Sequence, residues 1–307
     1  MTDALIETSG LSKDYGETHA LAPLDWDVRS GSITGVLGPN GAGKTTLIKL
    51  LLGITWPTAG SIRILGKDVA DDPVRIREEV GFLPEDKLLY DDMSIQAFLR
   101  FYGSFFTGWN EDAMGGLLDS WGIGLTSRIK ELSKGNRAKL VLGAVLCRSP
   151  RILLLDEPTI DLDPASGEEV LSLLAQWAAV QGRAVVITTH RLEEVERICD
   201  QILVLLGGEV ALRGDLDDLR AGWKRIRVTG KVPDLDEKRE WPGVRSVSGG
   251  AGWTEMVVDS GAEAVAERLR TAGAGEVVVE GLSLREMYLT LTGYEGGRLD
   301  EALEGVV

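Results

Sequence analysis

A glycine-rich segment that ends in lysine and threonine is the strongest chemical signal in this chain of 307 residues. The segment Gly38-Pro39-Asn40-Gly41-Ala42-Gly43-Lys44-Thr45 fits the phosphate-binding pattern G-x-x-x-x-G-K-[ST] at every fixed position. The apolar run 33–37 before it predicts a buried strand, and the run 46–52 after it predicts a helix. A glycine-rich turn that binds nothing is the alternative, and these flanking elements argue against it.

The chemistry expected of this loop is the binding of a nucleotide triphosphate. Its backbone N–H groups and the positive end of the following helix attract phosphate oxygens. Lys44 should reach the β- and γ-phosphates, and the Thr45 hydroxyl should ligate Mg²⁺. The residues expected to contact the nucleotide here are Gly38, Asn40, Gly41, Ala42, Gly43, Lys44, Thr45 and Thr46.

Two neighbouring carboxylates follow a second apolar run, 151–155. Such a run predicts a parallel strand that is buried on both faces, and functional groups of open α/β sheets lie at the carboxyl ends of strands. Adjacent residues point to opposite sides, so the two carboxylates should differ in role. Asp156 suits Mg²⁺ binding, and Glu157 suits polarising an attacking water as a general base. Two solvated carboxylates at a strand end are the alternative.

Four further segments complete a resemblance to the ATP-binding cassette family, the nucleotide-binding subunits of ABC transporters, over residues 4–222. Residues 132–136, Leu-Ser-Lys-Gly-Asn, resemble the family signature LSGGQ, and residues 158–164 resemble its D-loop, with Asp161 where a small residue is usual. His190, after the apolar run 185–187, resembles the switch histidine that contacts the γ-phosphate. Tyr15 is similar to the aromatic residue that stacks on adenine.

The resemblance also implies an assembly of two cassettes. Ser133 and Gly135 of the signature would contact the nucleotide held by the loop of a second subunit, and Asp163 of the D-loop is expected beside it. The chain departs from the family where Glu85 replaces the glutamine of the Q-loop. A carboxylate can still ligate Mg²⁺ and accept from water, but it cannot donate a hydrogen bond while ionised.

The fold expected is α/β: a P-loop NTPase cassette with a RecA-like core, an antiparallel β part and a helical subdomain at about 86–150. The aromatic residues of this subdomain recur at near-helical spacing and suit core packing or the edge of a groove for a membrane partner; they are Phe98, Phe101, Tyr102, Phe105 and Phe106. Residues 223–294 alternate as a small α/β accessory domain with Val265 and Leu269 inward, for packing or dimer stability. Residues 295–307 read as a frayed tail.

Composition narrows the function classes. The net charge of −15 argues against nucleic-acid binding, because phosphate backbones select basic surfaces. Cys147 and Cys199 lie in apolar helical surroundings and indicate core residues rather than a disulfide or a metal site. The start of the chain does not resemble a signal peptide, and no run approaches the ~20 apolar residues that span a bilayer. A transport channel would therefore be another polypeptide.

These observations predict an ATP-binding and ATP-hydrolysing subunit of a bacterial ABC transporter, an exporter in the first instance. It would work in the cytoplasm, on the inner face of the membrane, with integral membrane subunits and a second ATP-binding subunit, and without nucleic acid. Two alternatives remain: a soluble ABC ATPase of translation or nucleic-acid maintenance, and a nucleotide-gated regulator with little turnover. Co-purification with an integral membrane protein would separate the three classes.

Overall fold

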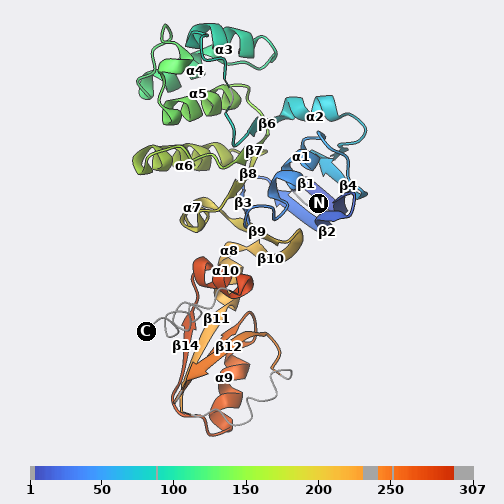
Figure 1. The fold of residues 1–307 in the computed structure, drawn as a ribbon, viewed down its shortest axis with the longest axis vertical. Coiled ribbons are helices and arrows are strands. Elements are labelled where there is room, and N and C mark those ends of the chain that lie inside the picture. Colours follow the sequence, from blue (N-terminus) through green and yellow to red (C-terminus); the bar gives the residue numbers. More distant parts are fainter. Residues whose placement is uncertain (1–3, 88, 231–240, 251, 294–307) are drawn as a thin grey trace, which may run out of the picture. The chain divides into compact units, whose positions relative to one another are not determined.

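The structure is a computed structural model that describes residues 4–87, 89–230, 241–250 and 252–293. Contacts divide the chain into two compact units, residues 1–213 and 214–307 (Figure 1). The sequence placed this boundary after residue 222. The division falls earlier because the helix α8 (Leu216–Gly222) groups with the second unit. The expected tail, 295–307, lies outside the described residues, as does the segment 231–240 of the expected accessory domain.

The central sheet of the first unit has six strands in the order β10-β9-β3-β8-β7-β6. They are β3 (Ile33–Leu37), β6 (Val80–Leu83), β7 (Ile152–Asp156), β8 (Ala184–Thr189), β9 (Gln201–Leu206) and β10 (Glu209–Asp215). Pairing is parallel from β6 through β7, β8 and β3 to β9, and every residue of β3, β7 and β8 is buried. Their carboxyl ends therefore share one edge of the sheet, where the phosphate loop, the carboxylates and the histidine follow.

The two faces of this sheet pack against different partners, because successive strand residues point to opposite sides. Leu154 and Val186 pack with the helix α1 (Lys44–Leu51) and an antiparallel sheet. Leu153 and Val185 pack with α5 (Lys134–Leu146), α6 (Pro164–Ala178) and α7 (Leu192–Ile198). Coverage on both faces explains why these strands are apolar throughout.

The antiparallel sheet has four strands in the order β2-β1-β4-β5. They are β1 (Ala4–Tyr15), β2 (Thr18–Arg29), β4 (Ala59–Ile64) and β5 (Lys67–Asp68). The hairpin between β1 and β2 places Tyr15 opposite Thr18. The short helix α2 (Pro73–Glu79) follows, and its N-cap Asp72 accepts from the backbone N–H of Arg75 at 3.0 Å.

The region expected to be helical contains α3 (Ile95–Gly103), α4 (Glu111–Ser120), the 3₁₀ turn η1 (Ile129–Glu131) and α5. The side chains of Ser94, Asn110 and Ser133 cap α3, α4 and α5, which explains where these helices begin. The aromatic stripe divides between core and surface. Phe98 is buried, whereas Phe101 and Phe105 are 48% and 66% exposed.

Within its described residues, the second unit contains α8, four strands and two further helices. The strands β11 (Lys224–Thr229), β12 (Val244–Gly250), β13 (Trp253–Val258) and β14 (Val277–Gly281) form an antiparallel sheet in the order β12-β13-β11-β14. The helix α9 (Ala262–Thr271) packs on its core through Val265 and Leu269, which confirms their expected inward orientation. The last helix is α10 (Leu284–Thr292), which begins with a capping box between Ser283 and Glu286.

The structure also bears on the expectations for the two cysteines and for membrane-spanning segments. Cys147 is buried, Cys199 is half-buried, and both thiols are free. Burial raises the pKa of the Cys147 thiol to about 11, so the reactive thiolate is disfavoured. Among the described residues, no helix combines the length and the apolar character that crossing a membrane requires.

Candidate active site

One cleft of about 560 Å³ gathers most of the residues that the sequence singled out. It lies where β3, β7 and β8 end, and its lining includes Gly38, Asn40, Gly41, Ala42, Gly43, Lys44, Thr45, Thr46, Glu85, Asp156, Glu157 and His190. The rest of the lining is Thr18, His19, Ala20, Pro39 and Ile160, none of which the sequence had indicated as a contact residue. These neighbours carry no motif of their own, because they reach the cleft through the β1–β2 hairpin or as companions of motif residues.

The phosphate loop turns so tightly that glycine is required at both of its ends. A Cβ atom at Gly38 would lie 2.4 Å from the carbonyl oxygen of Leu205, and one at Gly43 would lie 2.6 Å from that of Ala20. Gly43 also has a φ of 101°, a left-handed conformation, and caps the start of α1. The backbone of the loop therefore lies close to the backbones of Leu205 and Ala20.

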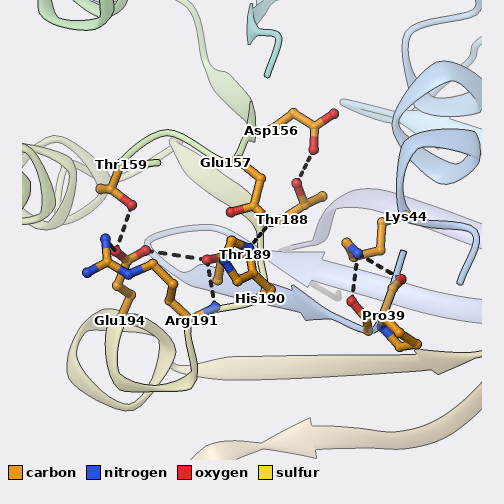
Figure 2. Close-up of polar contacts among 11 residues, drawn as sticks. Pro39, Lys44, Asp156, Glu157, Thr159, Thr188, Thr189, His190, Arg191 and Glu194 are labelled. Carbon is orange, nitrogen blue, oxygen red and sulfur yellow. Dashed lines mark hydrogen bonds and ion pairs between the residues drawn. The ribbon is translucent and has the colours of Figure 1, made fainter. Parts of the chain in front are cut away.

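Lys44 already bends toward the loop in which it lies. Its Nζ donates to the carbonyl oxygens of Gly38 at 2.6 Å and Pro39 at 3.1 Å (Figure 2). Burial lowers the pKa of Lys44, while the carboxylates of Glu157, Asp156 and Glu85 act in the opposite direction. Phosphate oxygens can replace the two carbonyl oxygens as acceptors without moving the ammonium group far.

Asp156 and Glu157 have different partners, as expected for neighbours with different roles. The hydroxyl group of Thr188 in β8 donates a hydrogen bond to Asp156 Oδ1 (Figure 2). Glu157 follows the end of β7 with a φ of 48°, which is rare for a residue with a side chain. Its backbone N–H donates to the carbonyl oxygen of Thr188 at 3.0 Å. The turn thus sends the two carboxylates to separate neighbours.

Glu157 and His190 form a pair, with 2.8 Å between Glu157 Oε1 and His190 Nδ1. The Glu157 side chain is only 8% exposed, whereas that of His190 is 59% exposed. The other carboxylate oxygen, Glu157 Oε2, is buried and has no hydrogen-bond partner among the described residues. A buried carboxylate oxygen is costly to leave unpaired, so Oε2 is the Glu157 atom with capacity left for a hydrogen-bond donor.

Four expected contact residues lie outside the cleft lining of this single chain. Tyr15 ends β1 and is 47% exposed, and Lys13 Nζ lies 4.9 Å from the centre of its ring. Tyr15 is nevertheless close to the lining in the hairpin, because it pairs with Thr18. An aromatic face at this position can stack on a base.

The remaining three, Ser133, Gly135 and Asp163, lie at the starts of α5 and α6. Ser133 caps α5, and Asp163 caps α6 by accepting from the backbone N–H of Ser166 at 3.1 Å. The hydrogen bonds from Ser166 lower the pKa of Asp163. A Cβ on Gly135 would lie 3.4 Å from Leu162, so the segment 132–136 is adjacent to the loop 158–164. The structure thus brings these two segments together, while Ser133, Gly135 and Asp163 themselves do not line their own chain's cleft.

Lys87, for which the sequence analysis held no expectation, lies near Asp161 and the backbone of Glu85. Lys87 Nζ donates to the carbonyl oxygen of Glu85 at 3.1 Å and lies 3.8 Å from Asp161 Oδ2. Its side chain is 5% exposed, and burial lowers its pKa against the attraction of Asp161, Glu85 and Asp156. In the sequence, the only available signal was that Glu85 and Asp161 are acidic where the family usually has other residues, and that Lys87 follows Glu85 by two positions.

Comparisons with known proteins agree with this geometry. Residues 21–160 match the family model described as ABC transporter. The chain is 33% identical over 303 residues to the Nod factor export ATP-binding protein I of Rhizobium etli, covering 94% of each chain. It is 36% identical over 240 residues to the daunorubicin resistance ATP-binding protein DrrA3 of Streptomyces coeruleorubidus, covering 74% of each.

Solved structures show the same likeness. An ATP-binding subunit of an ABC transporter superposes with a TM-score of 0.65 at 30% identity, over 71% of this chain and 92% of that one. A bacterial Atm1-family ABC exporter with ATP bound superposes with a TM-score of 0.63 at 27% identity, over 72% of this chain and 40% of that one. The cleft, its phosphate loop and these likenesses agree: the chain belongs to the ABC transporter family, as an ATP-binding subunit that hydrolyses ATP.

Proposed function

We propose that this protein powers export, and that Glu157 and His190 direct water onto the γ-phosphate of ATP. The observation that carries the proposal is the Glu157 carboxylate at the wall of the phosphate-loop cleft, whose Oε1 is held by His190 while Oε2 has no hydrogen-bond partner among the described residues. A carboxylate fixed through one oxygen can accept a proton from water through the other. The named relatives that act in Nod factor export and daunorubicin resistance support the direction of transport.

The residues of the cleft divide the work of phosphoryl transfer between binding and water activation. Lys44 exchanges the carbonyl oxygens of Gly38 and Pro39 for phosphate oxygens, and the loop amides bind the remaining phosphate charge. Glu157 orients water in line with the γ-phosphate. His190 Nδ1 lies 2.8 Å from Glu157 Oε1, and we assign the His190 side chain to contact with the same phosphate group. Catalysis of this kind rests on positioning and charge neutralisation.

The donor set also fits Mg²⁺, which would offset the charge of the phosphates. Thr45 and Asp156 both line the cleft, and Glu85 lines it as a third oxygen donor. One or two carboxylates with a hydroxyl suit Mg²⁺, because this ion takes its other ligands from phosphates and water. Thr188 holds Asp156 Oδ1, which keeps the carboxylate in a fixed orientation.

Two kinds of partner follow from surfaces that the single chain leaves unused. Ser133 and Gly135 lie beside the loop 158–164 but outside their own cleft, which supports their contact with nucleotide held by a second ATP-binding subunit. Tyr90, Phe101 and Phe105 form an exposed aromatic ridge with edge-to-face contacts at 6.4 and 5.1 Å. We assign this ridge to integral membrane subunits, with the protein on the cytoplasmic face of the membrane.

The substitution Glu157→Gln tests the proposal. Glutamine keeps the size of the side chain but cannot take a proton from water, so turnover should fall by about 10²-fold or more. ATP binding should persist, since Lys44 and the loop are untouched. Steady-state phosphate release and equilibrium binding of a fluorescent ATP analogue measure the two effects. Lys44→Ala is the contrasting variant, and it should lose binding itself. Wild-type turnover in Glu157→Gln would remove Glu157 from the chemistry.

The transport role has its own measurement. The protein should co-purify with an integral membrane protein encoded in the same cells, and that complex should hydrolyse ATP faster than the isolated subunit. Replacing Phe105, the most exposed member of the ridge together with Tyr90, by serine should weaken this association without lowering basal hydrolysis. Association with ribosomes or nucleic acid instead of a membrane protein would contradict the proposal.

A further inference from the structure

Two threonines beside the proposed catalytic pair bind the same buried carboxylate. Thr159 lies two residues after Glu157, and Thr189 immediately precedes His190. Thr159 donates to Oε1 of Glu194 at 2.7 Å, and Thr189 donates to Oε2 at 3.4 Å (Figure 2). We propose that Glu194 is a positioning residue for ATP hydrolysis, which ties the loop after β7 to the end of β8 and so keeps Glu157 paired with His190.

This network is buried and its polar atoms are satisfied. Thr159 and Thr189 are fully buried, and Glu194 is 7% exposed. Arg191 lies 2.7 Å from Glu194 Oε1, and its backbone N–H donates to the hydroxyl oxygen of Thr189 at 3.1 Å. The Thr189 hydroxyl therefore accepts from one side and donates to the other, which fixes its orientation. Removing one member leaves a buried carboxylate short of a donor, which is more costly than losing a surface contact.

The network adds a further attachment to the turn that follows β7. Glu157 has an unfavourable backbone conformation, and Oε2 has no partner among the described residues. The turn is joined to β8 by the Glu157 N–H bond to Thr188 and by the Glu157–His190 pair. Glu194 joins the turn to β8 again, because it binds Thr159, two residues after Glu157, and Thr189 at the end of β8. A strained conformation persists only where its surroundings hold it, so this attachment bears directly on the position of Glu157.

The network is separate from the residues that bind phosphate. None of Thr159, Thr189 and Glu194 lines the cleft, and the hydrogen bonds that join them do not involve the loop 38–45. The inference rests on the proposed function, because it acts through Glu157 and His190. It predicts a loss in kcat without a loss of ATP affinity, which a general loosening of the fold would not produce.

A pair of substitutions at Thr159 tests the inference in the full-length protein. Thr159→Val preserves the shape and removes the hydroxyl donor, and it should lower kcat about tenfold while equilibrium binding of a fluorescent ATP analogue stays within about twofold. Thr159→Ser restores the donor and should recover most of the lost turnover. Glu194→Gln should resemble Thr159→Val, because it keeps the side-chain shape but loses the charge that Arg191 and both hydroxyls bind.

Matched controls separate positioning from stability. Thr8 is another buried threonine, whose hydroxyl donates to the carbonyl oxygen of Leu24 at 3.1 Å in the antiparallel sheet. Thr8→Val removes the same group from a site away from the cleft, so it should lower the melting temperature without a comparable loss of kcat. Glu193→Gln removes a charge from an exposed position of the same helix and should leave turnover unchanged.

Variants made in the Glu157→Gln background separate the positioning role of the network from the proposed function of Glu157. If Thr159 acts through Glu157, then Thr159→Val should cause no further loss of kcat once Glu157 is replaced. Full turnover in Thr159→Val, or a loss that follows ATP affinity or the folded fraction, would overturn the positioning role while leaving the proposed function in place. Full turnover in Glu157→Gln alone would instead overturn the proposed function.

Discussion

At Glu157, one residue carries both the strain and the unpaired atom of the site. Its φ of 48° turns the chain sharply after β7, and this turn directs Asp156 to Thr188 and Glu157 to His190. Glu85 also lines the cleft, at the position where the resemblance to the family predicts glutamine. The Lys87 ammonium group lies beside the Glu85 carbonyl oxygen and near Asp161, so part of the added negative charge is offset.

Glu85 is predicted to contribute to Mg²⁺ affinity. Its carboxylate attracts the ion and repels the γ-phosphate, and the attraction dominates if Glu85 ligates the ion directly or through one water, because Coulomb energy falls with distance. Glu85→Gln should retain ATP binding and change the maximal turnover modestly, while raising the Mg²⁺ concentration for half-maximal activity. Glu85→Ala should reduce stimulation by the membrane partner more than it reduces basal hydrolysis.

The exposed neighbour Asp86, which does not line the cleft, supplies the control for this titration. Asp86→Asn removes the same charge one residue away and should leave the Mg²⁺ curve in place. If wild type and both Glu85 variants give the same Mg²⁺ curve, Glu85 has no part in the metal site and is only a surface carboxylate of the loop.

At the scale of elements, the start of α5 is adjacent to the loop before α6, and Ser133, Gly135 and Asp163 do not line their own cleft. Ser133 and Asp163 both serve as N-caps, so their side chains already have structural partners in the single chain. Gly135 leaves room between α5 and the loop 158–164, where a side chain would approach Leu162. This arrangement suits a surface that acts on the nucleotide of a second subunit, because both helix ends can present backbone N–H groups there.

Mixing two inactive variants is predicted to restore activity. Lys44→Ala disables nucleotide binding in its own chain, and Ser133→Arg blocks the start of α5. A dimer with one subunit of each kind keeps one intact composite site, so the mixture should recover part of the activity that both pure variants lack. ATP hydrolysis during titration of one variant with the other measures the recovery. An absence of recovery, with mixed dimers demonstrated by cross-linking, would count against action across the dimer.

At the scale of the whole molecule, the two compact units carry separate cores. The cleft is built entirely from residues of the first unit, whereas the second unit has its own sheet and a helix packed through Val265 and Leu269. The second unit shows no group of three or more potential metal-ligating side chains among its described residues. A packing or dimer-stabilising role, as expected from the sequence, remains the proposal for it.

A chain that ends at Gly222 is predicted to bind ATP normally. This end keeps β10 and α8 complete, and it leaves every residue of the cleft in place. The affinity for a fluorescent ATP analogue should stay within about threefold of wild type, a small difference in free energy. Dimer stability or coupling to the membrane partner can fall, and sedimentation would detect the first. A large loss of affinity in a shortened chain with a cooperative melting transition would show that the second unit contributes to the site.

The amino-acid sequence by itself determined the main strands and the groups at their ends. Parallel strands share one carboxyl edge, so the loop after 33–37, the carboxylates after 152–155 and the histidine after 184–189 had to meet. Local patterns were sufficient for this, because burial on both faces makes such strands apolar throughout. The sequence pattern of 223–294 likewise predicted strands and helices there, and Val265 and Leu269 of α9 pack inward as expected.

Only the tertiary structure decided which distant residues contact the loop, the carboxylates and the histidine of the site. Thr159 and Glu194 are 35 positions apart, and Lys87 and Asp161 are brought together from different loops. The φ of Glu157, the unpaired Oε2 and the exclusion of Ser133 from its own cleft are equally invisible in the sequence. The physical reason is that a motif records the spacing of neighbours along the chain, whereas buried polar partners are selected by packing between distant segments.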